Sequence, residues 1–223
     1  MPKSTAIHRL LIAVSSVLLL SVAPAKADFA ISVGSGTIDP GGNLLLDIGI
    51  ASDAPPQNLA EFELILQITP LSAAPGSSLV FVDPQSETFL QNADYIFVGN
   101  SDSIINGFDA TLVSSPVEIV VSDGTADFSN TSVTGGHLLA SVDLAHLLGG
   151  ASAAATAGDQ YSVSVRPVSF FAQASGDEID FSSTPGVVTV GAVAIPEPAA
   201  ATMLMLATCG VVLQRRRRSC FLR

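Results

Sequence analysis

Apolar residues alternate with polar ones along most of this 223-residue chain, and this period of two constrains the fold more than any other feature. In the stretch 44–50 every second residue is leucine or isoleucine, and Phe62, Leu64, Leu66 and Ile68 repeat the pattern. Successive side chains of a β-strand point to opposite faces, so each stretch would bury one face and leave the other wet. The pattern predicts half-buried strands.

The expected strands are 29–33, 44–50, 62–68, 79–82, 94–98, 110–113, 117–121, 137–144, 161–165 and 187–190. Glycine and proline predict a turn at 39–42, the Asp123-Gly124 pair predicts another, and 54–58 is expected to break the chain. Residues 145–158 are mostly small, and we expect a loop there with a helical turn near His146.

Short strands with turn signals between them are typical of β-sandwiches and barrels. We therefore expect an all-β domain over residues 28–191: a two-sheet antiparallel sandwich of jelly-roll type, each sheet having one core face and one wet face. A body of about 168 residues can enclose one hydrophobic core without disulfides. Cys209 and Cys220 both lie near the C-terminus, so the domain itself has no thiol chemistry.

The first 27 residues have the pattern of a secretory signal peptide, which would form a short helix. Lys3 and Arg9 precede the apolar run 10–22, and Ala25 and Ala27 place small residues at −3 and −1 before Asp28. We expect signal peptidase to cleave after Ala27 and the domain to be exported.

The C-terminal end has three parts, in the order linker, apolar run and basic end. Pro196, Glu197 and Pro198 lie in the linker 192–198, where the prolines favour an exposed, extended backbone. An uncharged helix over 199–213 would reach roughly 22 Å, short of the roughly 30 Å hydrocarbon core, so this transmembrane segment is marginal. The end 214–223 carries Arg215, Arg216, Arg217 and Arg218, which keep it cytoplasmic. A plain short membrane anchor would account for this pattern.

The same three parts resemble the PEP-CTERM sorting signal, which gives a second interpretation. The resemblance implies recognition by an exosortase, a membrane-embedded cysteine transpeptidase, and cleavage near Pro196-Glu197-Pro198. It also implies transfer of the body to the cell surface or extracellular matrix, with the membrane contacted only through the tail. Residues 219–223 extend beyond the family pattern and would be discarded with the tail.

The body is strongly acidic. Of twenty acidic residues only Glu197 lies outside residues 28–195, and of nine lysines and arginines only Arg166 lies inside, leaving 19 acids against one cation, a formal charge of −18. Such a field repels phosphate, which excludes nucleic acid and anionic membranes as partners. A solvated, repulsive surface is the simpler explanation of this acidity, although it also attracts divalent cations.

The sequence contains no motif of a known catalytic chemistry: no Gly-x-Ser-x-Gly, no His-Glu-x-x-His and no phosphate-binding loop. The body's histidines, His137 and His146, lack the spacing of a helical metal pair and are expected to be structural or at the surface. Nineteen carboxylates make some close pair inevitable, but a glycosidase would also line its cleft with aromatics, and the chain has no tryptophan and two tyrosines, so an extracellular hydrolase has no residues to support it. We therefore expect no enzyme.

Calcium is the one cofactor for which the body offers candidate ligands. Asp177, Glu178 and Asp180 follow a glycine in one loop, and Asp123 lies near Asp127 in another. Carboxylates on loops suit this hard cation, although neither spacing matches the twelve-residue calcium loop. Acids on loops are usually just solvated, which is the simpler explanation of both groups.

The order of segments in the body is similar to that of cohesin-like domains, whose sandwich shares its architecture with bacterial carbohydrate-binding modules. The similar segments are 41–48, 62–66, 79–82, 137–144, 176–180 and 186–190. The resemblance implies a fold more than an activity, so no binding residue is carried over.

From these features we expect a secreted, exosortase-processed, noncatalytic protein with a structural or adhesive role at the cell surface or in the extracellular matrix. The alternative is a binding module for polysaccharide or, in cohesin fashion, for a surface protein. Scarce aromatics weigh against sugar stacking, since Phe170 and Phe171 are expected in the core.

Overall fold

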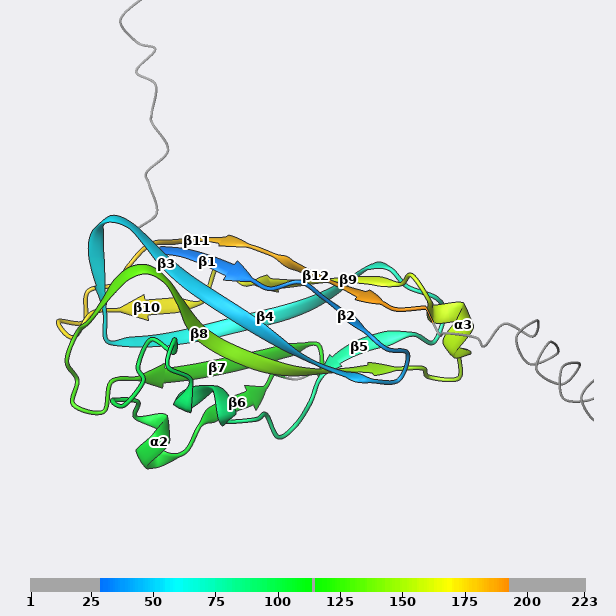
Figure 1. The fold of residues 1–223 in the computed structure, drawn as a ribbon, viewed down its shortest axis with the longest axis horizontal. Coiled ribbons are helices and arrows are strands. Elements are labelled where there is room, and N and C mark those ends of the chain that lie inside the picture. Colours follow the sequence, from blue (N-terminus) through cyan, green and yellow to red (C-terminus); the bar gives the residue numbers. More distant parts are fainter. Residues whose placement is uncertain (1–28, 114, 193–223) are drawn as a thin grey trace, which may run out of the picture.

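The computed structural model describes residues 29–113 and 115–192, which form a two-layer β-sandwich (Figure 1). The five-stranded sheet has the order β11 (Phe181–Thr184), β1 (Phe29–Val33), β3 (Asn43–Leu59), β8 (Thr131–Leu147) and β5 (Ser78–Phe81). The seven-stranded sheet has the order β2 (Gly36–Ile38), β12 (Gly186–Val190), β9 (Gln160–Val165), β4 (Glu61–Ser72), β7 (Glu118–Gly124) and β6 (Asp109–Leu112), with β10 (Phe170–Ala172) against β4. The described helical turns are η1 (Thr88–Gln91), α2 (Ser103–Asn106) and α3 (Ala153–Thr156).

The two sheets enclose a single hydrophobic core, and the period of two supplies it. In β4, the side chains from Phe62 to Ile68 in steps of two are buried, whereas Glu61 and Glu63 are exposed. β3 behaves likewise, with Leu46, Ile48 and Ile50 buried. The all-β sandwich predicted from the sequence is therefore confirmed.

Most neighbouring strands are antiparallel, but β1 pairs in parallel with β11 and β2 in parallel with β12. Both parallel pairs arise because the chain changes sheets twice at one place, between β1 and β2 and between β11 and β12. The two crossings touch: the Val187 N–H donates to Ser35 Oγ over 2.9 Å. A Cβ added at Gly186 would lie 1.7 Å from the carbonyl oxygen of Gly34, so the crossing requires glycine on steric grounds.

Four sequence predictions about local structure are wrong, and three of them concern strands and the turns between strands. The stretch 94–98 forms turns with one isolated bridge, Tyr95 to Leu138, and buries three successive residues, Tyr95, Ile96 and Phe97, in place of the half-buried strand that was expected. Asp123 and Gly124, which were expected to form a turn, are the last two residues of β7, because protein donors satisfy the Asp123 carboxylate there. The expected break at 54–58 is a register shift within β3, which continues to Leu59.

The helical turn expected near His146 forms later in the chain, as α3, because β8 continues through His146 to Leu147. Three observed strands were not predicted, namely β2, β10 and β11. Each has only three or four residues, too few to display a period of two.

Several predicted features lie outside the described residues. These are Ala25 and Ala27 of the leader, the linker residues Pro196, Glu197 and Pro198, the apolar run 199–213 and Arg215 to Arg218. Within the part of the chain that the structure describes, no helix is long and apolar enough to cross a membrane. The two targeting signals therefore stay predictions.

The crossing point gives a test of the fold. Replacing Gly186 with alanine should lower the free energy of unfolding by about 1–3 kcal/mol or more, because the new Cβ collides with backbone that has no side chain to move aside. Gly136→Ala is the matched control: nothing lies within 4 Å of its Cβ position, so its effect should stay within about 0.5 kcal/mol. Urea denaturation of both variants measures this, and equal stabilities would contradict the tight crossing.

Candidate functional site

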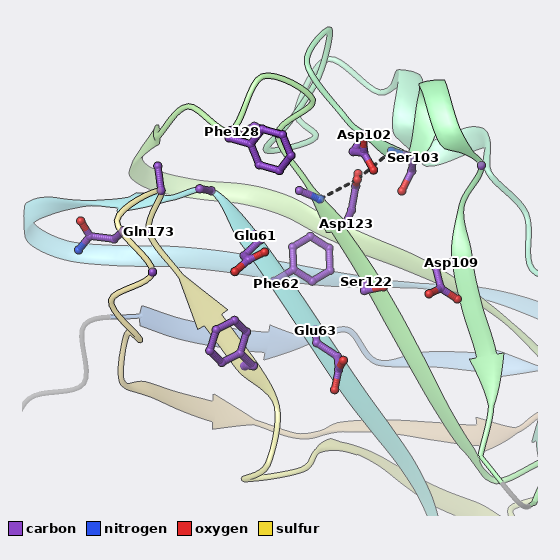
Figure 2. A pocket seen from close by; sticks show the side chains of 17 residues that line it. Glu61, Phe62, Glu63, Asp102, Ser103, Asp109, Ser122, Asp123, Phe128 and Gln173 are labelled. Atoms are coloured by element: carbon purple, nitrogen blue, oxygen red, sulfur yellow. Dashed lines mark hydrogen bonds between the residues drawn. The ribbon is translucent and has the colours of Figure 1, made fainter.

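A pocket of about 520 Å³ lies on the outer face of the seven-stranded sheet, where β10, β4, β7 and β6 run side by side (Figure 2). The α2 turn, the loop after β7 and the loop after β10 complete its wall. Its lining residues are Ala60, Glu61, Phe62, Glu63, Asp102, Ser103, Gly107, Asp109, Ser122, Asp123, Gly124, Thr125, Phe128, Phe170, Gln173, Ala174 and Gly176.

Strand register explains why this part of the face is hollow. Glu63 of β4 is paired with Phe170 of β10 and with Ser122 of β7, and Ser122 is paired with Asp109 of β6. Residues directly opposite one another share a face, so these four side chains form one row across four strands. In the next row Glu61 lies opposite Gly124. Ser122 and Gly124 are small, so the floor between the flanking carboxylates stays open.

Asp123 fixes one wall of the pocket to the sheet. Its Oδ1 accepts hydrogen bonds from the backbone N–H of Ser103 at 3.0 Å and of Gly124 at 2.7 Å. Its Oδ2 accepts from Ser101 Oγ at 2.5 Å and from the Tyr95 hydroxyl. Figure 2 shows the Asp123 side chain between β7 and the α2 turn. Four donors compensate the carboxylate for leaving water, so Asp123 is a structural anchor.

Tyr95 also helps to hold this wall of the pocket against the sheet, as one of the donors to Asp123. Burial, and then the nearby Asp123 carboxylate, raise the pKa of Tyr95 far above its ordinary value, so the phenol stays protonated and donates. Its ring packs edge-on against Phe89 and Phe97. The segment before α2 is thus held by apolar packing and by one charged acceptor together.

Phe128 stands on the pocket rim with its side chain 83% exposed (Figure 2). Its φ of 56° lies in the left-handed region, which a bulky residue rarely adopts. Two hydrogen bonds hold the turn: the Phe128 N–H donates to the Thr125 carbonyl at 3.1 Å, and Thr125 Oγ1 donates to the Ser129 carbonyl at 2.7 Å. The turn therefore fixes the backbone from which the Phe128 ring projects into solvent.

The neighbouring Asp127 reinforces this turn. Its Oδ1 accepts from Asn100 Nδ2 at 2.7 Å and from the Ser129 N–H at 3.1 Å. The Asn100 bond, followed by those from Ser129, lowers the pKa of Asp127 to about 2, so this fully exposed carboxylate is ionised at neutral pH. The sequence did not reveal this arrangement, because an exposed Phe in a loop carries no pattern of its own.

The carboxylates around the pocket have no positively charged partner within the described part of the domain. Arg166, the one lysine or arginine among the described residues, pairs with Glu118 at 3.0 Å. The carboxylates of Glu61 and Glu63 accept no hydrogen bond from the part of the chain that is described. The rim is therefore a concentration of free negative charge.

His146 belongs to a buried polar network away from the pocket. The Gly41 N–H donates to its Nδ1 at 3.0 Å, so the ring proton lies on Nε2 and is donated to Ser77 Oγ at 2.9 Å. Ser77 in turn lies 2.6 Å from the Tyr161 hydroxyl. A Ser–His nucleophile needs an unprotonated Nε2 that accepts from serine, which is the reverse of this arrangement. His146 is structural, as expected.

The residues predicted to bind calcium do not converge in the structure. Asp177 accepts from Ser175 Oγ at 2.8 Å, whereas Glu178 and Asp180 line a separate hollow of about 260 Å³ beside β11. Asp123 and Asp127 are each engaged in their own networks. Across residues 29–113 and 115–192, no group of three or more His, Cys, Asp or Glu side chains is placed to hold a metal ion. Calcium binding stays a prediction.

The comparisons with known proteins place the fold. No protein-family model matches the chain, and no curated protein matches it. Among solved structures, the chain is similar to a cohesin from a type I cohesin–dockerin complex of Clostridium thermocellum, with 14% identity, a TM-score of 0.50, and 76% of this chain and 98% of that chain covered.

Two further cohesins show the same likeness. The sixth cohesin from scaffoldin B of Acetivibrio cellulolyticus, in complex with a Cel5 dockerin, has 13% identity, a TM-score of 0.49, and 73% and 98% coverage. A non-cellulosomal cohesin from the archaeon Archaeoglobus fulgidus has 14% identity, a TM-score of 0.46, and 79% and 98% coverage. The Clostridium thermocellum structure supports the cohesin-like sandwich predicted from the sequence, and at this identity the likeness concerns the fold alone.

The His146 network predicts a pH dependence of stability. Burial lowers the pKa of His146, with Asp159 acting weakly in the opposite sense, and protonation would also break the bond from Gly41. The folded state therefore binds the proton less readily than the unfolded chain, whose histidine pKa is about 6.5. The free energy of unfolding should be highest above that pH and fall as the pH drops from 7.5 to 5.5.

Thermal unfolding across this range measures the effect. His146→Gln should be less stable at pH 7.5 yet lose most of the dependence, while His137→Gln, at a partly buried histidine in the same strand whose Nε2 has no hydrogen-bond partner among the described residues, should keep it. An unchanged slope in His146→Gln would show that other groups cause the dependence.

Proposed function

We propose that the chain is an exported, noncatalytic binding protein of the cell surface or extracellular matrix, whose cohesin-like sandwich holds a partner protein at the pocket over β10, β4, β7 and β6. The observation that carries this proposal is the pocket itself. A hollow of about 520 Å³ is framed by regular strands and by a loop that displays Phe128, 83% exposed, at its rim. Pockets of this size are typical of ligand sites, and exposed aromatics are typical of binding hot spots.

The backbone conformation and the exposure of Phe128 both lower the stability of the folded state, which favours a binding role over a purely structural one. A non-glycine residue at positive φ costs on the order of 1 kcal/mol, and exposing a large apolar ring forgoes the stabilisation that burial would bring. Folding stability alone gives no reason to keep both. A partner that covers the ring supplies one.

The fold favours a protein partner. The Clostridium thermocellum cohesin of similar fold is described in complex with a dockerin, so the same kind of sandwich supports protein recognition in that molecule. A polysaccharide could also stack on Phe128, which makes sugar binding the alternative to be tested. An adhesive role follows from either ligand, since the protein would be displayed outside the cell.

Export rests on the two ends of the sequence. The leader with Ala25 and Ala27, and the Pro196-Glu197-Pro198 motif followed by an apolar run and Arg215 to Arg218, have the order expected for signal peptidase and then exosortase. The cytoplasmic arginines would orient the tail during processing. The body would then be released or attached outside, and the membrane contacted only in passing.

Binding at the pocket can be tested with the chain from Asp28 to Ile195, which contains both sheets and the whole described core. Ser122→Trp should fill the floor of the pocket while leaving the sheet intact, because Ser122 faces outward. Selection from a random peptide display library should yield peptides that bind saturably to the unchanged chain and at least about tenfold more weakly to Ser122→Trp, the loss expected when a central contact worth over 1 kcal/mol is blocked.

Ser182→Trp on β11, an exposed strand serine outside the pocket lining, is the matched control and should bind as the unchanged chain does. A glycan array run in parallel separates the alternative: saturable sugar binding that Ser122→Trp removes, with no peptide selected, would replace the protein partner by a polysaccharide. Ligands of either kind that ignore Ser122→Trp would refute the pocket.

Export can be tested by intact mass and location of the protein in cells with and without the exosortase. The proposal expects an extracellular chain that begins at Asp28 and ends near Pro196 to Pro198, present only when the enzyme is present. An intact C-terminus in the membrane of both strains would reduce the tail to a plain anchor.

A further inference from the structure

We infer that the pocket recognises an arginine side chain of the partner protein, with the guanidinium held between Phe128 and the carboxylates of Glu61 and Glu63. This rests on the proposed function, because it names the chemistry of the partner at the same site. The inference combines three observations: a hollow of side-chain size, an exposed ring and uncompensated charge.

The charge determines the sign of the ligand. Glu61, Glu63 and Asp109 are exposed along two adjacent rows of the sheet, and Asp102 lines the wall opposite. A cation of the same domain could neutralise these carboxylates, but Arg166, the one lysine or arginine among the described residues, is paired with Glu118. A partner that brings its own cation therefore gains attraction at this rim, whereas an anionic partner is repelled.

The form of the pocket distinguishes an organic cation from a metal ion. A volume of about 520 Å³ is far larger than a metal ion requires, and the described residues contain no group of three ligands placed around a point. Apolar surface contributes as well, since Phe128 and Phe170 line the same hollow as the carboxylates. A long side chain with an apolar stem and a charged end matches such a mixed lining.

Arginine fits this combination better than lysine. Its guanidinium is planar, stacks on an aromatic face and donates two parallel hydrogen bonds to a carboxylate. Phe128 offers an exposed ring at the rim, and the carboxylates of Glu61 and Glu63 offer the acceptors. A lysine ammonium would satisfy the charge but not the flat, forked geometry.

Polycations will also be drawn to this acidic domain without any site, so the test must separate the pocket from the general field. The probe is the peptide Gly-Arg-Ser-Arg-Gly, compared with versions in which citrulline or lysine replaces arginine. Citrulline keeps the shape but not the charge. Isothermal titration calorimetry at moderate salt should show binding of the arginine peptide, loss of about tenfold or more with citrulline, and a smaller loss with lysine.

Charge-matched variants locate the contact. Glu61→Gln with Glu63→Gln should weaken the arginine peptide about tenfold or more, the loss expected when charged hydrogen-bond acceptors are removed. Asp39→Asn with Asp94→Asn removes the same charge at exposed positions outside the pocket and should change the affinity less than about twofold. Equal weakening by both pairs would mean that only the overall field attracts the peptide and would overturn the inference.

Phe128→Leu removes the aromatic face but no charge, and should weaken the arginine peptide by about two- to fivefold, the range of an exposed cation–π contact. Leu71→Ala, at an exposed leucine outside the pocket, should have no effect. An unchanged affinity in Phe128→Leu would overturn the role of the ring.

The two proposals fail in different ways. If peptides selected from the library bind the pocket and are lost with Ser122→Trp, yet contain no arginine and the arginine probe does not bind, the proposed function stands and the arginine inference falls. If Ser122→Trp leaves every selected peptide bound, the pocket itself is refuted and both fall together.

Discussion

The carboxylate of Asp123 joins the sandwich to the loops that stand on it. It accepts from Tyr95, Ser101, Ser103 and Gly124, so a single buried charge connects β7 to the segment before α2. That segment covers the core with Tyr95, Ile96 and Phe97, and it supplies one wall of the pocket. Removing the acceptor would leave several buried donors without partners, each costing about 1–3 kcal/mol. Core cover and pocket wall therefore depend on the same interaction.

On the surface, by contrast, most carboxylates of the described residues have no positively charged partner. The one arginine of the described residues pairs with Glu118, and apart from the buried Asp123 and Asp159 the other described acids lie at least partly in contact with water. Such an excess keeps the domain soluble and apart from other acidic molecules, and it gives the face over β4 and β7 a defined sign. Other apolar side chains are exposed elsewhere on the surface, but among the described residues the exposed large aromatic is Phe128, which lies at this charged rim.

The period of two predicted the strands that carry the core, because a long strand buried on one face must alternate. β4, β9 and the first part of β3 follow that rule where strands were expected, whereas β8 alternates only from Val142 to His146 and buries Leu138 to Val142 in succession. The rule failed at 94–98, where three neighbouring side chains are buried under a turn, and at Asp123, where distant donors replace the solvent that a turn would provide. The sequence did not reveal the pocket, because the pocket too depends on contacts between segments far apart in the chain. Its residues come from β4, α2, β6, β7, β10 and two loops, and nothing in the local sequence of any one of them marks a site.

The sequence by itself determined the all-β class, the alternating faces of the long strands, the acidity of the body and the absence of a cysteine from it, because these depend on composition and on local periodicity. Tertiary structure alone decided the order of strands in the two sheets, the parallel pairings at the Gly34 and Gly186 crossing, and the row that places Phe170, Glu63, Ser122 and Asp109 together. These depend on contacts between residues far apart in the chain, whose pairing is fixed only when both sheets close over one core.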